Sequence, residues 1–296
     1  MKHTILTPLF LMLASCNPQI SLTNLGDLHA PSLVSAKMES ATSARLVFDE
    51  PLSHGGAFIE ARIPASGLAI QGNELIVQFR EALPLEESTL VRGRVKDARG
   101  NSCNFTLPLW GKNEHPATLL ISECTTKGTK TQPDRVELSC IRAGSLSGIT
   151  IADGPPGWET DRMILPDQYV WPGTRIVVQF QQGEEILPLH SSLKGLSANN
   201  GCVVLLGDPT AHAAILDALV YSNRQSEQYG GWGTSSTQSA IKRVVELGGW
   251  EGDDPFLAVD SSYSTSTRSM QRKGEVDTDG ASDWTIAPSG GATWGY

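Results

Sequence analysis

Alternating apolar and polar residues predict strands through the middle of the chain. Val136, Leu138 and Cys140 alternate with polar residues, which is the period of a strand that buries one face. Ile149 and Ile151 repeat this pattern after a Ser-Gly break. Further apolar runs occur at 119–121, 203–206 and 218–221. These runs predict a β-rich region that begins near residue 117.

A similar pattern covers residues 31–110. Leu75, Val77 and Phe79 alternate with polar residues, as do Phe105, Leu107 and Leu109. The stretch 97–101 contains glycine and asparagine, which adopt positive φ readily and so mark a turn. Short strands separated by such turns predict a β-sandwich. The polar stretch 111–116 ends in proline and is the predicted boundary between two domains.

Residues 222–263 interrupt the strand pattern of the second region. Ile241, Val244 and Val245 are spaced by three and one residues, which gives a short helix one apolar face. We expect this helix over Gln238–Leu247, capped by Ser236 or Thr237 and ended by Gly248. A segment of this length is too long for an idle connection in a compact domain.

Six short motifs, in their order and spacing, resemble the lamin tail domain, an immunoglobulin-like sandwich of nuclear lamins and many exported bacterial proteins. The resemblance spans about 117–288, and the alternative is another seven-strand sandwich. A typical lamin tail has a shorter connection where this chain has 222–263. The motifs are Ile121-Ser-Glu123, Val136-Glu-Leu138, Leu146-Ser-Gly148, Val203–Asp208, Ala218–Tyr221, and Arg268-Ser-x-Gln-Arg272 with Asp283-Trp284.

The first region resembles bacterial Ig-like modules of surface proteins, which usually act as spacers or binding units. The resemblance rests on Phe48-Asp-Glu-Pro-Leu52 and Lys96-Asp-Ala-Arg-Gly-Asn-Ser102. The expected fold is therefore all-β, with two immunoglobulin-like β-sandwich domains in tandem. We expect the domains at 31–110 and 117–296, with the insertion 222–263 and its short helix in the second.

The first thirty residues predict export and lipid attachment. Lys2 precedes an apolar core, Ile5–Ala14, which is too short to span a bilayer and is typical of a signal peptide. Leu13-Ala-Ser-Cys16 resembles a bacterial lipobox, which implies a signal peptide at 1–15, a lipid on Cys16 and a tether at 16–30. The alternative is an ordinary secretory signal with an incidental cysteine.

The charge of the chain argues against nucleic acid as a partner. The formal net charge is −9, whereas binding to phosphates needs basic patches. Acidic residues also outnumber basic ones from Ala117 onward. The chromatin contacts of nuclear lamins therefore should not be transferred to this chain, and we expect membrane contact only through the N-terminal lipid.

Neither a metal site nor a catalytic constellation is predicted, and no cofactor is expected. Four cysteines, 103, 124, 140 and 202, could form disulfides after export or remain buried thiols. Ser191-Ser-Leu-Lys194 matches S-x-x-K, but its partner motifs are missing. Two acidic groups could hold calcium, although solvated turns are the preferred interpretation. These groups are Glu251, Asp253 and Asp254, and Asp277, Asp279 and Asp283.

Aromatic residues make the insertion the predicted binding region. Tyr229, Trp232, Trp250 and Phe256 lie among glycines and serines, a composition that supplies rigid anchors on adaptable backbone. Trp232, inside Gly230–Gly233, is expected to lack packing neighbours, whereas Trp250 follows the helix and is expected to pack. The alternative is that both tryptophans fold back and cover the sandwich.

Two functional hypotheses follow. The first is a non-catalytic exported lipoprotein that presents Ig-like domains to an envelope or host protein, or to a polysaccharide. The alternative is an accessory subunit of a separate envelope nuclease or phosphoesterase, since bacterial lamin tail domains often sit beside such enzymes. No catalytic residue is assigned under either hypothesis.

Overall fold

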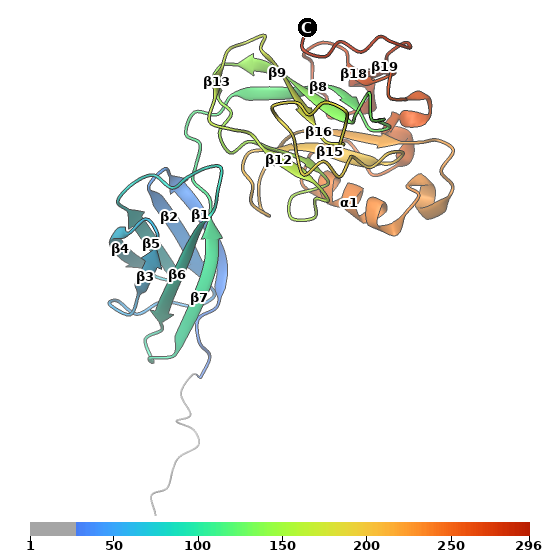
Figure 1. Ribbon diagram of the computed structural model, residues 1–296. Coiled ribbons are helices and arrows are strands. Elements are labelled where there is room, and N and C mark those ends of the chain that lie inside the picture. Colours follow the sequence, from blue (N-terminus) through green and yellow to red (C-terminus); the bar gives the residue numbers. More distant parts are fainter. Residues whose placement is uncertain (1–27) are drawn as a thin grey trace, which may run out of the picture.

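The computed structural model describes residues 28–296, where strands predominate and α1 is the one α-helix (Figure 1). The expected all-β class is therefore confirmed. The predicted signal peptide, Cys16 and nearly all of the predicted tether lie outside the described residues. No helix within residues 28–296 combines the length and the apolar character needed to cross a membrane.

The first unit consists of seven strands in two antiparallel sheets. The sheet orders are β1-β2-β5-β4 and β3-β6-β7. β6 shows the origin of this arrangement, because its residues alternate strictly between buried and exposed, as a strand with one face on the core must. The strands are β1 Leu33–Ser40, β2 Ser43–Phe48, β3 Phe58–Ala61, β4 Ala65–Gln71, β5 Glu74–Phe79, β6 Thr89–Lys96 and β7 Ser102–Leu109.

The two sheets of the first unit enclose one hydrophobic cluster. Leu46, Val77 and Val91 are fully buried and come from strands of both sheets. The turn predicted at 97–101 connects β6 to β7, and Asp97 Oδ1 accepts hydrogen bonds from the backbone N–H groups of Arg99 and Asn101. Gly100 adopts φ +92° there, a conformation that favours glycine.

The second unit contains two five-stranded sheets, ordered β14-β9-β8-β18-β19 and β12-β11-β15-β16-β17. Each pairing is antiparallel except that of β16 with β17. The strands are β8 Thr118–Thr125, β9 Arg135–Arg142, β10 Gly144–Ser145, β11 Thr150–Asp153, β12 Arg162–Ile164, β13 Tyr169–Val170, β14 Arg175–Gln179, β15 Gly201–Leu206, β16 Ile215–Ser222, β17 Val259–Asp260, β18 Met270–Arg272 and β19 Trp284–Ile286.

The second unit has three layers where the insertion folds against it. Figure 1 shows the sheet with β8 and β9, then the sheet with β15 and β16, then α1. Every residue of β15 is buried, because one face meets the opposite sheet and α1 contacts the strand from the other side. The insertion comprises the short 3-10 helices η2 Gln228–Gly231, η3 Pro255–Leu257 and η4 Ser261–Tyr263, helix α1 Ser235–Glu246 and strand β17; η5 Ala281–Asp283 follows later.

The predicted helix exists but begins three residues earlier than expected. α1 spans Ser235–Glu246. Thr234, and neither Ser236 nor Thr237, is the N-cap, because its side-chain oxygen accepts the backbone N–H of Thr237 at 3.1 Å. Gly248 follows the helix with φ +77°, as a helix-ending glycine does.

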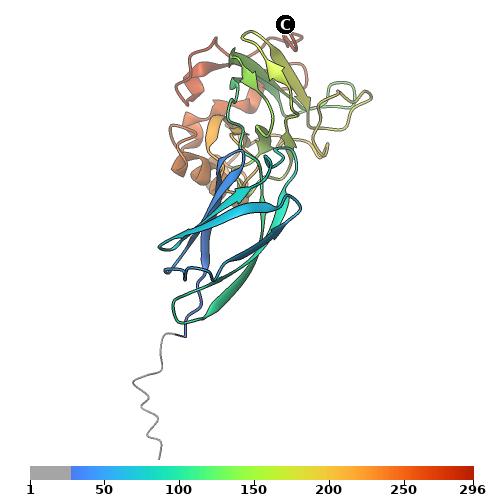
Figure 2. The ribbon, with the colours of Figure 1, turned by 90° about the vertical axis from the view of Figure 1, so that its left-hand side faces the viewer.

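The two units lie end to end, as Figures 1 and 2 show from perpendicular directions. Their hydrophobic clusters share no residue. Residues 111–116 connect them, and the side-chain amide of Asn113 donates to the carbonyl oxygens of Ser145 and Ser147 at 3.0 and 2.9 Å. Glu86 of the first unit accepts the backbone N–H of Asp167. That the units are independent domains stays a prediction.

Candidate functional site

Two tryptophans fasten the insertion to the sheet beneath it. Trp232 is 2% exposed and Trp250 is 4% exposed. Their indole N–H groups donate to the carbonyl oxygens of Asp253 at 3.0 Å and Leu257 at 3.1 Å. Buried Ile241 and Val244 of α1 belong to the same cluster. The two hydrogen bonds thus join segments of the insertion to each other, while the indole rings pack in the hydrophobic cluster.

The expectation that Trp232 lacks packing neighbours is corrected by this burial. The glycines around it, with Gly230 at φ +66° and Gly231 at φ +103°, do not leave the indole free. They let the backbone turn, so that the ring enters the cluster beneath α1. Both indole rings are buried, as the alternative interpretation expected, so neither ring is exposed for contact with a partner.

Three other aromatic residues of the insertion lie on its outer surface. Tyr229, Phe256 and Tyr263 are 50%, 79% and 66% exposed. We call them the aromatic surface. Tyr229 and Phe256 are among the binding residues predicted from the sequence, and Tyr263 is a further aromatic residue of the same insertion. Burial of a large apolar ring stabilises the fold, and these three rings do not contribute in that way.

The backbone that carries Phe256 is firmly held. Asp254 Oδ1 accepts the backbone N–H of Phe256 at 2.9 Å and caps η3. Arg224 donates to the carbonyl oxygens of Phe256 and Ala258 at 3.2 and 2.8 Å. Its guanidinium carbon lies 5.0 Å from the centre of the Phe256 ring, within the range of a cation–π contact.

The contact between Arg224 and Phe256 was not predicted from the sequence. Arg224 lies 32 residues before Phe256, and no local pattern connects the two positions. Its role follows only from the way in which the insertion returns to the end of β16. An ordered ring on a pre-organised backbone loses less entropy on binding than a mobile one.

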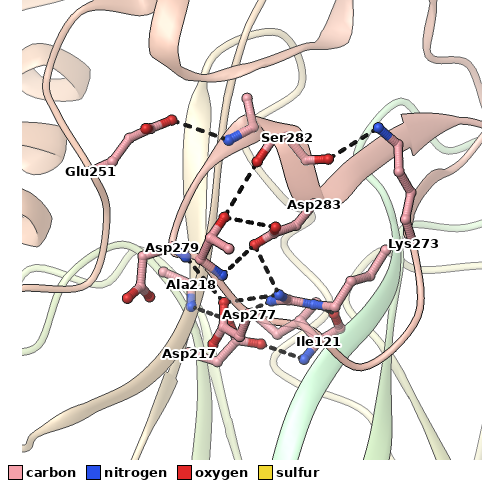
Figure 3. Close-up of polar contacts among 12 residues, drawn as sticks. Ile121, Asp217, Ala218, Glu251, Lys273, Asp277, Asp279, Ser282 and Asp283 are labelled. Carbon is pink, nitrogen blue, oxygen red and sulfur yellow. Dashed lines mark hydrogen bonds and ion pairs between the residues drawn. The ribbon is translucent and has the colours of Figure 1, made fainter.

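Two members of the second acidic group, Asp277 and Asp283, share the buried Arg272 with Asp217. Figure 3 shows these three aspartates gathered in one place. Arg272 donates to Asp217 Oδ1 at 2.6 Å and to Asp277 Oδ1 at 2.9 Å, and lies 3.5 Å from Asp283 Oδ2. Its guanidinium stacks over Trp284, 4.8 Å from the ring centre. Asp283 is only 7% exposed, so the expectation of a solvated turn was wrong for this residue.

The position where a cation would meet these carboxylates is therefore taken by the guanidinium of Arg272. Its Nε also donates to the carbonyl oxygen of Ile121 at 2.9 Å, which ties β18 to β8. Asp217 is fully enclosed, and burial raises the pKa of its carboxyl to about 7, while Arg272 acts in the opposite direction. The single positive charge of Arg272 cannot neutralise three carboxylates, and this also favours a raised pKa for Asp217.

The first acidic group is dispersed by the fold. Asp254 caps η3, and Glu251 accepts the backbone N–H of Ala281 at 3.3 Å. Between residues 28 and 296, one set of possible metal ligands does come together, at exposed His29 and Asp49 with Glu50. Asp49 is already engaged there by the backbone N–H of Ser32.

The S-x-x-K stretch is part of a loop built around Asp161. Ser191 Oγ donates to Asp161 Oδ2 at 2.8 Å, and the backbone N–H groups of Ser192 and Lys194 donate to the same carboxylate. The hydroxyl of Ser191 is thus occupied in shaping the loop. Its neighbour His190 points its Nδ1 at the carbonyl oxygen of Ser191, 3.0 Å away.

All four cysteines in the described part of the chain are free thiols. Cys124, Cys140 and Cys202 are buried in the core, and burial raises the pKa of each thiol. Of the two alternatives left open by the sequence, the structure therefore has buried thiols at these three positions, whereas Cys103 is a partly exposed thiol. A protonated buried thiol is a poor nucleophile.

Comparisons with known proteins place the similarity in the second unit. A family model named TP_1001_2nd, described as "protein second domain", matches residues 117–187 and 190–286. An "Uncharacterized protein" of Treponema pallidum (strain Nichols) is 24% identical over 198 residues, which cover 59% of this chain and 50% of that protein. The chain thus spans about half the length of that relative. No solved structure matches.

Proposed function

This chain belongs to the TP_1001_2nd family, and from that premise we propose that it is a non-catalytic exported lipoprotein. Its role is to present two immunoglobulin-like domains for interaction at the cell envelope. The family description names no activity, so the argument rests on the geometry of the chain. The observation that carries it is the aromatic surface, whose rings are exposed and whose member Phe256 has a backbone held by hydrogen bonds with Asp254 and Arg224.

Strand order supports an immunoglobulin-like fold for the first unit. Constant-type immunoglobulin domains have one sheet with the order ABED and another with the order CFG. The orders β1-β2-β5-β4 and β3-β6-β7 correspond to these when the seven strands are lettered along the chain. The bacterial Ig-like modules that this unit resembles usually act as spacers or binding units.

The resemblance to lamin tails is supported by the contacts of the closing motif. Arg272 stacks on Trp284 and binds Asp217, so the two halves of the closing motif meet each other and the residue that precedes the Ala218–Tyr221 motif. This gives the closing Arg and Asp-Trp a structural role. The function of the unit then lies in what its insertion adds, since a sandwich fold by itself names no ligand.

Export and lipid attachment belong to this proposal through the sequence alone. The apolar core Ile5–Ala14 and Leu13-Ala-Ser-Cys16 support them. Wild-type cells should incorporate labelled palmitate into the protein and cells with Cys16→Ser should not. Equal labelling of both would remove the lipid anchor from the proposal.

Cross-linking in intact envelopes tests the interaction. The double variant Tyr229→Ser/Phe256→Ser should lose the cross-linked partner, because loss of aromatic anchors weakens an interface by about 2 kcal/mol or more, roughly thirtyfold in affinity. Its melting temperature should stay close to that of wild type, since both rings are largely exposed.

Trp171→Ser is the matched control, because Trp171 is 67% exposed and lies outside the insertion. It should keep the cross-links. Unchanged cross-links in the double variant would contradict the proposal. A nuclease or phosphoesterase among the cross-linked proteins would instead favour the accessory role.

A further inference from the structure

A pocket of about 350 Å³ lies beside α1, between the end of β11 and the start of β15. It is within the size range of small-molecule sites in proteins. It shares no residue with the aromatic surface, so the inference drawn from it does not depend on the function proposed above. Its lining consists of Asp153, Gly154, Trp158, Thr160, Ser197, Gly201, Cys202, Ser236, Thr237, Ser239 and Ala240.

Asp153 is the one charged residue of this lining, and it is only 4% exposed. Thr160 Oγ1 donates to its Oδ2 at 2.5 Å, and Ser197 Oγ donates to the same oxygen at 3.1 Å. Oδ1 accepts only the long bond from the backbone N–H of Ser197, at 3.4 Å. Because a carboxylate oxygen has two acceptor positions, Oδ1 retains capacity for a ligand donor.

Trp158 is an exposed indole in the pocket lining, 57% accessible to solvent. It ends the rigid loop Gly154-Pro-Pro-Gly-Trp158, in which Gly154 and Gly157 adopt φ +121° and +83°. The backbone N–H of Trp158 donates to the carbonyl oxygen of Pro155 at 3.0 Å. Both prolines are buried, so the loop is anchored while the ring remains available.

The opposite wall is formed by the beginning of α1. Ser236, Thr237 and Ser239 bring hydroxyl groups, which both donate and accept hydrogen bonds. The start of a helix also carries a partial positive charge. This charge disfavours a cation, whereas the carboxylate of Asp153 disfavours an anion, and the lining contains no lysine, arginine or histidine. A neutral ligand with many hydroxyl groups fits both walls.

We propose that this pocket binds one neutral sugar ring. The hydroxyl groups of the sugar donate to Asp153 Oδ1 and exchange hydrogen bonds with the serine and threonine side chains. The apolar face of the ring packs on Trp158, as carbon–hydrogen surface packs on an aromatic face. Cys202 lines the pocket as a protonated thiol, because burial raises its pKa. It does not react with the ligand.

Ligand-observed NMR on the full chain, purified in detergent, tests the assignment. The probes are methyl glucoside, methyl galactoside and N-acetylglucosamine, with tetramethylammonium and inorganic phosphate as charged probes. At least one sugar should receive saturation from the wild-type protein. Trp158→Ala should weaken its binding roughly tenfold or more, which corresponds to a loss of about 1.4 kcal/mol.

Two further variants complete the test. Trp171→Ala removes another exposed indole and should bind the sugar like wild type. Ser239→Phe fills the pocket from an exposed position of α1 and should abolish binding while the melting temperature is maintained. Failure of every sugar to bind, or sugar binding that survives both Trp158→Ala and Ser239→Phe, overturns the proposal. Binding of a charged probe in place of the sugars, lost in the same variants, overturns the neutral class.

Discussion

Arg272 is the residue at which the largest number of charged side chains meet in the second unit. Its side chain is 1% exposed and that of Asp217 is fully buried. Burial of such a pair is costly unless each partner is fully bonded. Three carboxylates, one backbone carbonyl and the Trp284 ring satisfy the guanidinium. Burial and the neighbouring carboxylate of Asp277 nevertheless raise the pKa of Asp217, whereas Arg272 lowers it.

The raised pKa of Asp217 makes stability depend on pH. Its pKa is about 7 in the folded chain, against 3.8 for an unperturbed group. Between these values the folded chain holds a proton that the unfolded chain has lost. Stability should therefore fall as pH rises from about 4 to about 7, by on the order of 4 kcal/mol at most.

Urea unfolding of wild type and Asp217→Asn at pH 5 and pH 8 measures this effect. The asparagine variant cannot ionise, so it should lose less stability than wild type between the two pH values, whatever constant cost the replaced oxygen adds at both. Asp253→Asn, at an exposed position, should follow wild type. Parallel behaviour of all three proteins would contradict a raised pKa for Asp217.

At the scale of elements, the insertion acts as a third layer on the sheet with β15. Thr234 caps α1, and the helix contacts β15. Trp232 and Trp250 fill the space at its base and bond to the carbonyl oxygens of Asp253 and Leu257. The same layer thus stabilises the sheet from one side and carries the exposed rings on the other.

Truncation of a buried tryptophan should separate the structural rings of the chain from the exposed ones. Trp232→Ala should lower the free energy of unfolding by about 3–5 kcal/mol, as removal of a large buried ring does. Trp158→Ala should change it by roughly 0.5 kcal/mol or less, because Trp158 is largely exposed. Thermal and urea unfolding measure both, and equal stability of the two variants would contradict the anchoring role of Trp232.

At the scale of the whole molecule, two hydrophobic clusters lie end to end with a short polar connection between them. The first cluster is enclosed by two sheets, and the second by two sheets together with the insertion. The contacts that join the units involve Leu85 beside Gly148, and Glu86 bonded to Asp167. No residue belongs to both hydrophobic clusters, so each unit should retain its structure without the other.

Limited trypsin digestion tests this separation. Lys112 is exposed in the connection, and cleavage after it should release a stable fragment that begins at Asn113. Lys112→Gln should delay this cut without changing cleavage elsewhere. If the released fragment were degraded at once, or if no cut preceded global unfolding, the units would form one cooperative structure.

The sequence alone determined the β-rich class and the existence of α1. Residue alternation in β6 is a local property, and so is the spacing of Ile241 and Val244; in β9 the alternation predicted one buried face, but Glu137 and Ser139 are buried too, and the backbone N–H of Gly295 from the C-terminal segment donates to Glu137. Each pattern arises from which face of a single element avoids water. Buried positions such as Val136 and Leu138 followed from the same reasoning. The helix start was missed by three residues, because several hydroxyl side chains near it are equally able to cap.

Only the tertiary structure decided which of the candidate residues are exposed and which are buried. Trp232 is buried by contacts with a segment about twenty positions away, and Phe256 is held by Arg224 from 32 positions before it. Arg272 meets Asp217 across 55 positions. Such meetings depend on how sheets and insertion pack together, and a single sequence carries no local signal of that packing. For this reason the sequence located the aromatic segment, while the fold selected its exposed rings.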